Sequence, residues 1–204
     1  MPSPIDFWFD YSSPYGYLAS ERIEAVAARH DRAVVWHPML LGAVFKVTGE
    51  RPLIDAPLKG EYSLMDIRRS AREHGIAFAM PELFPIGAVA ASRATLWLRD
   101  HEDAARAARA VPLIHALYRA YWRDGRDIST PSSVLDIAAD TGVERAELEA
   151  ALGERSVKDA LRAEVDSSID RGVFGSPSFA VDGELFWGHD RLEMLERWLA
   201  SGSW

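Results

Sequence analysis

The spacing of the apolar residues changes along this chain, and this change limits the folds that the chain can adopt. Over 5–10, Ile, Phe and Phe alternate with Asp, Trp and Asp, which is the period of a strand. Apolar residues then recur at helical spacing over 17–30, and Ser13 followed by Pro14 has the form of an N-cap with proline at the first helical position. A β-branched and aromatic run over 33–38 predicts a second strand. The chain therefore opens with a predicted βαβ motif.

The middle of the chain, over 39–171, shows no strand-like alternation and is predicted to be helical. Glycine and proline clusters divide it into segments. Pro112 falls inside a helical pattern, where it predicts a new helix or a kink. The expected helices cover 59–74, 88–100, 102–125, 133–141, 145–152 and 157–170.

The end of the chain returns to strands. The pair Asp182-Gly183 stands between two short strand-like runs, 178–181 and 184–187, and is the strongest hairpin signal in the sequence. The apolar stripe over 191–200 is typical of an amphipathic helix. We therefore predict a closing ββα unit.

The order βαβ, helices, ββα is the topology of thioredoxin with a large insertion. We expect an α/β fold in which 1–40 and 156–204 form a thioredoxin-like domain. The all-helical segment 41–155 would be a domain inserted into it.

Composition narrows the chemistry that such a fold could carry. The 204 residues include no cysteine, which excludes a disulfide framework, a thiolate metal site, a cysteine nucleophile and any dithiol redox chemistry of the protein's own. The six histidines lack the spacing of a zinc site, so we expect no metal. A net charge of −8 argues against nucleic acid as a partner. Any sulfur chemistry must therefore arrive with a ligand.

The sequence predicts neither a membrane span nor an export signal. Its longest stretch without Asp, Glu, Lys or Arg, 33–45, has 13 residues and is too short to cross a bilayer. Residues 1–6 lack the basic and apolar segments of a signal peptide. We therefore expect a cytoplasmic protein without a membrane partner.

The reactive position of a thioredoxin-like fold is the turn before its first helix, because the N-terminus of that helix stabilises a thiolate. Here the turn reads Ser13-Pro14-Tyr15-Gly16, which is a Cys-Pro-Tyr-Cys motif with both sulfurs removed. Ser13 is thus a candidate catalytic residue. The local sequence taken alone favours the structural alternative, in which Ser13 is only the N-cap of the helix.

A second landmark is Gly175-Ser176-Pro177-Ser178, which precedes the third predicted strand. Thioredoxin-like folds place a cis-proline here, facing the reactive turn, whereas an X-Pro bond without that context is usually trans. In this position the backbone of Ser176 would be open to a peptide-like ligand.

Four stretches carry a resemblance to a known family. They are DFWFDYSSPYGYLAS at 6–20, GERPLIDAPLKGEY at 49–62, the region 84–94, and FGSPSFAVDGELFWGHDRLEML at 174–195. Together they resemble the 2-hydroxychromene-2-carboxylate isomerases, relatives of the kappa-class glutathione transferases in the DsbA-like group. The resemblance implies a thioredoxin domain with a helical insertion, a homodimer, and reduced glutathione as cofactor.

The resemblance also implies roles for particular residues. Ser13 matches the serine that holds the glutathione sulfur as thiolate, and Ser176 matches the residue whose backbone pairs with the cysteinyl part. His189 and Asp190 match a pair at the start of the last helix, where Asp190 can take the γ-glutamyl ammonium while helix N–H groups take its carboxylate. Lys59 matches a lysine near the glycyl end. Asp190 also has an alternative reading as the N-cap of the last helix.

Two positions depart from the family pattern. Glu50 stands where the family commonly has Asn in a Gly-Asn-x-Pro loop, and Gly87 stands where the isomerases often have Asn after Phe-Pro-x. Glu50 is kept among the expected glutathione-binding residues, with an anion in place of a neutral donor.

The function implied is a glutathione-dependent cis/trans isomerase acting on 2-hydroxychromene-2-carboxylate or a similar intermediate of aromatic degradation. Its small aromatic carboxylate substrate would need an apolar slot and a cation, for which Lys46, Arg51 and Arg93 are candidates. One alternative is a kappa-like transferase that consumes glutathione. The other is a non-catalytic thioredoxin-like binding protein, which the residues at Glu50 and Gly87 favour.

Overall fold

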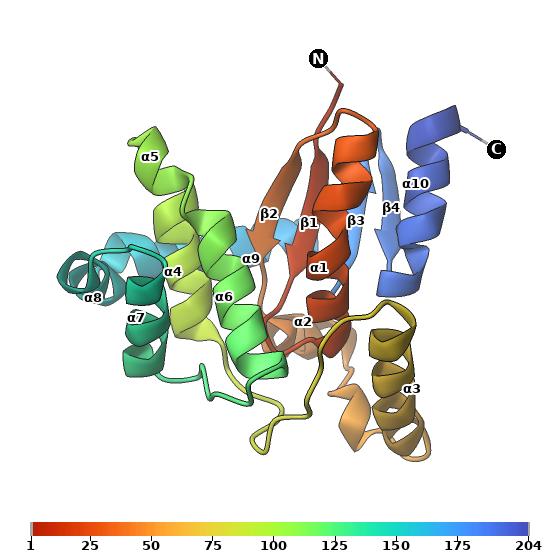
Figure 1. Cartoon of the computed structure of the whole chain (residues 1–204), viewed down its shortest axis with the longest axis horizontal. Helices are drawn as coiled ribbons and strands as arrows, with labels where there is room; N and C mark the ends of the chain where they lie inside the picture. Colours follow the sequence, from red (N-terminus) through yellow and green to blue (C-terminus); the bar gives the residue numbers. More distant parts are fainter. Residues whose placement is uncertain (1, 204) are drawn as a thin grey trace.

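The computed structural model describes residues 2–203, which are organised around a sheet of four strands (Figure 1). The strand order is β2, β1, β3, β4, with β2 parallel to β1, β3 antiparallel to β1, and β4 antiparallel to β3. The hairpin strands have the predicted bounds. The strands are β1 Ile5–Phe9, β2 Val34–Pro38, β3 Ser178–Val181 and β4 Glu184–Trp187.

Two helices complete the predicted motifs, and the others fill the segment between β2 and β3. Helix α1 (Pro14–Arg29) joins β1 to β2, and α10 (Leu192–Ser201) follows β4. The remaining helices are α2 Leu41–Thr48, α3 Lys59–Glu73, α4 Val89–Arg99, α5 Ala104–Ala107, α6 Ala110–Trp122, α7 Pro131–Asp140, α8 Arg145–Gly153 and α9 Arg155–Asp170, with 3-10 turns η1 Leu53–Asp55 and η2 His189–Arg191.

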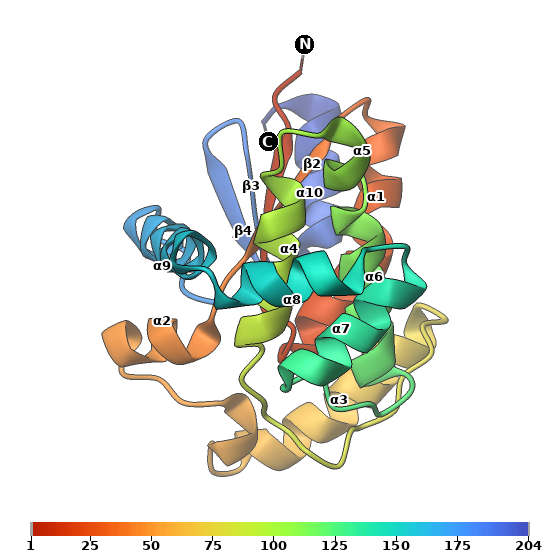
Figure 2. The same ribbon diagram turned by 90° about the vertical axis from the view of Figure 1, so that its left-hand side faces the viewer.

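Different helices cover the two faces of the sheet. Phe7 pairs in register with Phe179, and their stacked rings, 5.0 Å apart, belong to a core that includes residues of α1 and α10. Trp8 points to the other face, where it packs in a smaller cluster with Val44 of α2 and Ile169 of α9. Figure 2 shows α2 and α9 on the opposite side of the sheet from α1.

The α/β fold of the thioredoxin type is thereby confirmed, because the βαβ and ββα units share one sheet. The helices α2 to α9 separate the two units along the chain. The division into 1–40 plus 156–204 and 41–155 stays a prediction, and its second boundary falls after the first residue of α9.

Three expectations about the helices were wrong in part. The helix expected over 102–125 is divided into α5 and α6, and Pro112 lies in the first turn of α6, where its missing N–H is tolerated. Helix α2 was not predicted, since it is short and its residue before the first turn, Leu40, has no capping side chain. The last helix begins after Arg191, so Asp190 is not its N-cap and lies in η2 instead.

Within residues 2–203, none of the helices combines the length and the apolar character that a membrane crossing requires.

Candidate functional site

Ser13 lies at the junction of β1 and α1 and has an extended backbone conformation, with φ −96° and ψ 112°. Its hydroxyl oxygen accepts a hydrogen bond from the Gly16 N–H at 3.0 Å, so Ser13 is the N-cap of α1. The same hydroxyl donates to the carbonyl of Ser176 at 2.8 Å. The side chain is almost fully buried, with 4% of its surface exposed. Capping and contact with the opposite loop therefore coexist in one residue.

The Ser176–Pro177 peptide bond is cis, which the sequence left open. The Ser176 hydroxyl accepts a hydrogen bond from the Asp10 N–H at 2.9 Å, and the Pro177 carbonyl accepts one from the Gly188 N–H at 2.9 Å. These bonds tie the proline loop both to the end of β1 and to the turn after β4. The two landmarks found in the sequence thus face each other in the fold.

The fourth position of the reactive turn, Gly16, is tightly enclosed. A Cβ atom there would lie 2.7 Å from the Tyr118 hydroxyl and 2.9 Å from the Ser176 hydroxyl. Tyr118 is itself fixed, because it is buried and donates to the Asp10 carbonyl at 3.0 Å. The place of the second sulfur in a dithiol motif is therefore occupied by α6.

Asp10 is a member of the site that sequence reasoning missed. Its Oδ1 accepts from the Ser12 N–H at 2.8 Å, and its Oδ2 accepts from the Leu41 N–H at 2.7 Å. Burial raises the pKa of this carboxyl to about 6, although both backbone hydrogen bonds act to lower it. The only sequence signal was an acidic residue directly after a strand of large apolar side chains.

Tyr15 joins the reactive turn to two other elements. Its ring stacks on that of His189 in η2, with centroids 4.9 Å apart and planes at 8°, and its hydroxyl donates to Asp66 of α3 at 2.8 Å. His189 is buried, which lowers its pKa, and its Nδ1 has no hydrogen-bond partner within residues 2–203. Asp66 carried no sequence motif and was not predicted.

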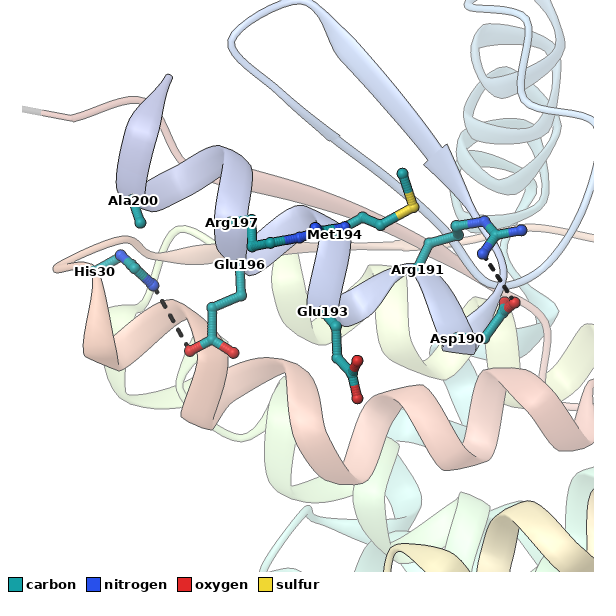
Figure 3. Close-up of a pocket in the computed structure, with 8 residues that line it drawn as sticks. All are labelled: His30, Asp190, Arg191, Glu193, Met194, Glu196, Arg197 and Ala200. Carbon is teal, nitrogen blue, oxygen red and sulfur yellow. Dashed lines mark ion pairs between the residues drawn. The ribbon is translucent and has the colours of Figure 1, made fainter. Parts of the chain in front are cut away.

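Asp190 follows His189 but is exposed, and its carboxylate forms an ion pair with Arg191 at 3.2 Å. Figure 3 shows this pair at one end of an open depression along α10. The residues lining the depression are His30, Asp190, Arg191, Glu193, Met194, Glu196, Arg197 and Ala200. Asp190 and Arg191 of η2 belong to this lining, whereas Ser13 does not.

The other two predicted glutathione-binding residues lie on the segment from α2 to α3. Glu50 is exposed just beyond the end of α2, and Lys59 is exposed at the first turn of α3. Neither side chain forms a hydrogen bond or an ion pair with another residue of the described range 2–203. The structure therefore brings Ser13 and Ser176 into contact and His189 close to both through Tyr15, but it joins neither Glu50 nor Lys59 to them.

A second cis bond, Phe84–Pro85, lies in the segment between α3 and α4. The Ile86 N–H donates to the Ser12 hydroxyl at 3.0 Å, and the Tyr121 hydroxyl donates to the Leu83 carbonyl at 2.8 Å. These bonds hold the segment against the reactive turn. Gly87, at the position of a family amide, has nothing within 4 Å of where a Cβ would stand.

Aromatic side chains lie beside the proline loop. Trp187 is 54% exposed and meets Phe174 edge to face, with centroids 4.9 Å apart. The indole covers Gly175, where a Cβ would come within 2.3 Å of Nε1. Among the three candidate cations, Lys46 and Arg51 are exposed, whereas Arg93 is half-buried with its Nε unpartnered among the described residues.

Comparison with known proteins places this arrangement in a family. The model of the DSBA-like thioredoxin domain matches residues 4–200. The chain is 27% identical over 201 residues to a 2-hydroxychromene-2-carboxylate isomerase of Sphingobium xenophagum, covering 98% of this chain and 99% of that protein. It is 27% identical over 206 residues to glutathione S-transferase kappa 1 of Caenorhabditis elegans, covering 94% and 88%.

A solved structure has the same fold over nearly the whole length. It is a 2-hydroxychromene-2-carboxylate isomerase, with a TM-score of 0.84 and 24% sequence identity, and the match covers 96% of this chain and 94% of that one. The resemblance seen in the sequence is thereby confirmed.

Proposed function

From the fact that this chain belongs to the family of DSBA-like thioredoxin domains, we propose that it is a glutathione-dependent cis/trans isomerase of a small aromatic carboxylate. Its relatives include proteins named 2-hydroxychromene-2-carboxylate isomerase and glutathione S-transferase kappa, at about 26% identity. That level of identity supports a glutathione-related enzyme. The isomerase activity and the substrate are part of the proposal.

The observation that carries the proposal is the contact between the Ser13 hydroxyl and the Ser176 carbonyl across the cis-proline loop. A hydroxyl donor at a helix N-terminus favours a thiolate, and the chain has no thiol of its own. The residues present therefore fit glutathione. When bound, glutathione would supply a thiolate that adds to a conjugated carbon and leaves after rotation about the resulting single bond.

The residues of the site would exchange hydrogen bonds when the cofactor arrives. The Ser13 hydroxyl would turn from the Ser176 carbonyl to the sulfur and hold it as the anion. The freed Ser176 carbonyl would accept the N–H of the cysteinyl residue, as an edge strand does. Ser13 is thus the proposed catalytic residue, and Ser176 is a binding residue.

The ends of glutathione would be held by charges. Asp190 would take the γ-glutamyl ammonium beside the buried ring of His189, and Lys59 would attract the glycyl carboxylate. Glu50 lies on the same segment as Lys59 and would oppose that attraction. Trp187 and Phe174 would offer the substrate an apolar surface, and Arg93 would face its carboxylate.

The test is a calorimetric titration of reduced glutathione into the wild type, with ultraviolet absorbance to follow thiolate formation. Wild type is expected to bind with a thiolate signal. Ser13→Ala removes the donor and the cap, and Ser13→Asp keeps a capping acceptor but replaces the donor with an anion. Both variants are expected to lose the signal. Ser20→Ala is the control, because that buried hydroxyl of α1 donates to the Tyr17 carbonyl instead.

A thiolate signal that survives in Ser13→Asp would contradict the role of Ser13, and the absence of binding to wild type would contradict the glutathione site. Product analysis then separates the two activities. An isomer formed with glutathione unchanged supports the isomerase, whereas a thioether adduct supports the kappa-like transferase that the relative from Caenorhabditis elegans suggests. The homodimer and the cytoplasmic location stay predictions.

A further inference from the structure

We propose that Asp10 is a positioning residue that clamps α2 to the reactive turn, and that protonation of its carboxylate releases this clamp and weakens glutathione binding in mildly acidic solution. This inference rests on the proposed function for its ligand, while the clamp itself can be tested without any ligand.

Asp10 joins the parts of the chain that form the site. Its carboxylate accepts from the N–H groups of Ser12 in the turn and Leu41 in α2, at 2.8 and 2.7 Å. Its own N–H donates to the hydroxyl of Ser176 in the proline loop, and its carbonyl accepts from the Ser13 N–H at 2.9 Å. A change at this one residue therefore reaches the turn, the loop and α2.

Helix α2 is held by apolar packing and by the Asp10 carboxylate. Val44 is buried, and Leu41 and Ala43 are half-buried against two apolar clusters, but Leu40 before the helix offers no capping side chain. The first N–H groups of a helix need an acceptor from elsewhere, and the Asp10 carboxylate supplies one for Leu41. Glu50 follows α2 directly, and the η1 turn beyond it contacts α3, so a released α2 would disturb the placement of the charges at Glu50 and Lys59.

The two bonds are strongest to an ionised carboxylate. When the carboxyl is protonated, one oxygen becomes a donor and both oxygens lose their charge, so the group accepts hydrogen bonds less well. Protonation therefore weakens the bond to Ser12 or the bond to Leu41. The less secured partner is α2, since Ser12 is also held by the Ile86 N–H that donates to its hydroxyl.

The groups around Asp10 bring the protonation of its carboxyl close to neutral pH. The ionisable groups around Asp10 are the phenols of Tyr11 in the same turn and of Tyr118 and Tyr121 on α6. Burial raises the pKa of each phenol above its usual 10, so all three stay neutral. Asp10 has no ion pair within residues 2–203, and burial raises its own pKa to about 6.

The experiment measures the affinity for S-methylglutathione by calorimetry from pH 5 to pH 8, because the sulfur of that probe does not ionise. Wild type is expected to lose affinity as the pH falls through about 6, by roughly fivefold, the effect of one hydrogen bond. Asp10→Asn mimics the protonated state and should show the weaker affinity at every pH.

Two substitutions at Leu41 form a matched pair. Leu41→Pro removes the N–H and shortens the side chain, and proline is tolerated at the first helical position because the extended conformation of Leu40 suits the residue before a proline. Without that N–H the clamp is absent, so this variant should show the weaker affinity at every pH. Leu41→Ala keeps the N–H and should keep the wild-type midpoint. This pair serves even where Asp10→Asn does not fold.

Hydrogen exchange of the α2 amides, without ligand, measures directly how firmly the clamp holds α2. Exchange should speed up below pH 6, relative to the intrinsic rate, in wild type but not in Asp10→Asn. A pH step in affinity or protection that survives in Asp10→Asn would belong to another group, such as His189, and would overturn the proposal. Protection without any binding of glutathione or its methyl derivative would instead contradict the proposed function alone.

Discussion

Ser12 and Ser13, at the reactive turn, each use their polar groups in more than one contact. The Ser13 hydroxyl both caps α1 and reaches Ser176, and the Ser12 hydroxyl fixes the segment with the second cis-proline. The turn is thus held in shape before any ligand arrives, which lowers the entropy cost of binding. Residue-scale changes should therefore alter binding with little effect on the fold.

A substitution at the exposed Glu50 tests whether a single change alters binding with little effect on the fold. Replacing Glu50 with Asn removes an anion from the segment that carries Lys59, so glutathione, which brings two carboxylates, should bind up to about threefold more tightly. The gain should shrink in high salt, because the interaction is between exposed charges.

Calorimetry at two ionic strengths checks the prediction. Glu149→Gln, which neutralises an exposed carboxylate on α8, is the matched control and should leave the affinity unchanged. Unchanged binding by Glu50→Asn would mean that Glu50 is not near the bound tripeptide, and weaker binding would mean that Glu50 helps to hold it.

Elements whose signals are local could be predicted, and elements held by distant contacts could not. The hairpin could be predicted because Asp182-Gly183, the pair that forms its turn, is itself a recognisable sequence motif. Helix α2 was missed because its capping group, Asp10, lies 31 residues away. Similarly, Ser13 and Ser176 were found from short motifs, whereas Asp66 enters the site only through the fold, 51 residues from Tyr15.

The contact between α1 and α6 makes stability depend on pH. His115 of α6 contacts Glu24 at 2.7 Å and Glu21 at 3.5 Å. Burial lowers the pKa of His115, but the two carboxylates outweigh this and raise it above 6.5. The contact therefore stabilises the protein fully below pH 6.5 and loses this contribution as the pH rises through the raised value.

Chemical denaturation between pH 6 and 9 should show this loss, of about 1 kcal/mol, in wild type and not in His115→Gln. His101→Gln is the control, since the nitrogens of His101 bond to the Asp103 N–H and to Arg106. Equal pH profiles for wild type and His115→Gln would exclude the mechanism.

At the scale of the whole molecule, a cluster of charges joins β2 of the sheet to α4 and α9. Glu164 of α9 accepts from His37 of β2 at 2.6 Å and from Arg99 of α4 at 3.0 Å. Burial raises the pKa of Glu164, but the bonds from His37 and Arg99 lower it to about 2. The stabilisation is therefore present above pH 4.5 and is lost as the pH falls towards 2.

Glu164→Gln should lower the free energy of unfolding at pH 7 by roughly 2 kcal/mol, because it removes the anion between the half-buried His37 and Arg99 and leaves them only Asp6 and Asp100 as acidic partners. It should also reduce the sensitivity of stability to acid. Both effects are measured by denaturant unfolding at pH 7 and at acidic pH, with two probes monitoring the same transition. Arg155→Ala, which removes an exposed pair with Asp159, is expected to change stability by less than about 0.5 kcal/mol.

The tight packing around Gly16 limits which chemistry substitutions in the reactive turn could introduce. Cysteines at positions 13 and 16 would give the sequence a dithiol motif. The second side chain would, however, collide with the buried, hydrogen-bonded hydroxyl of Tyr118. A conversion to a disulfide oxidoreductase would need a third, simultaneous change in α6. In evolutionary terms, Tyr118 of α6 blocks a stepwise route from this turn to a dithiol motif.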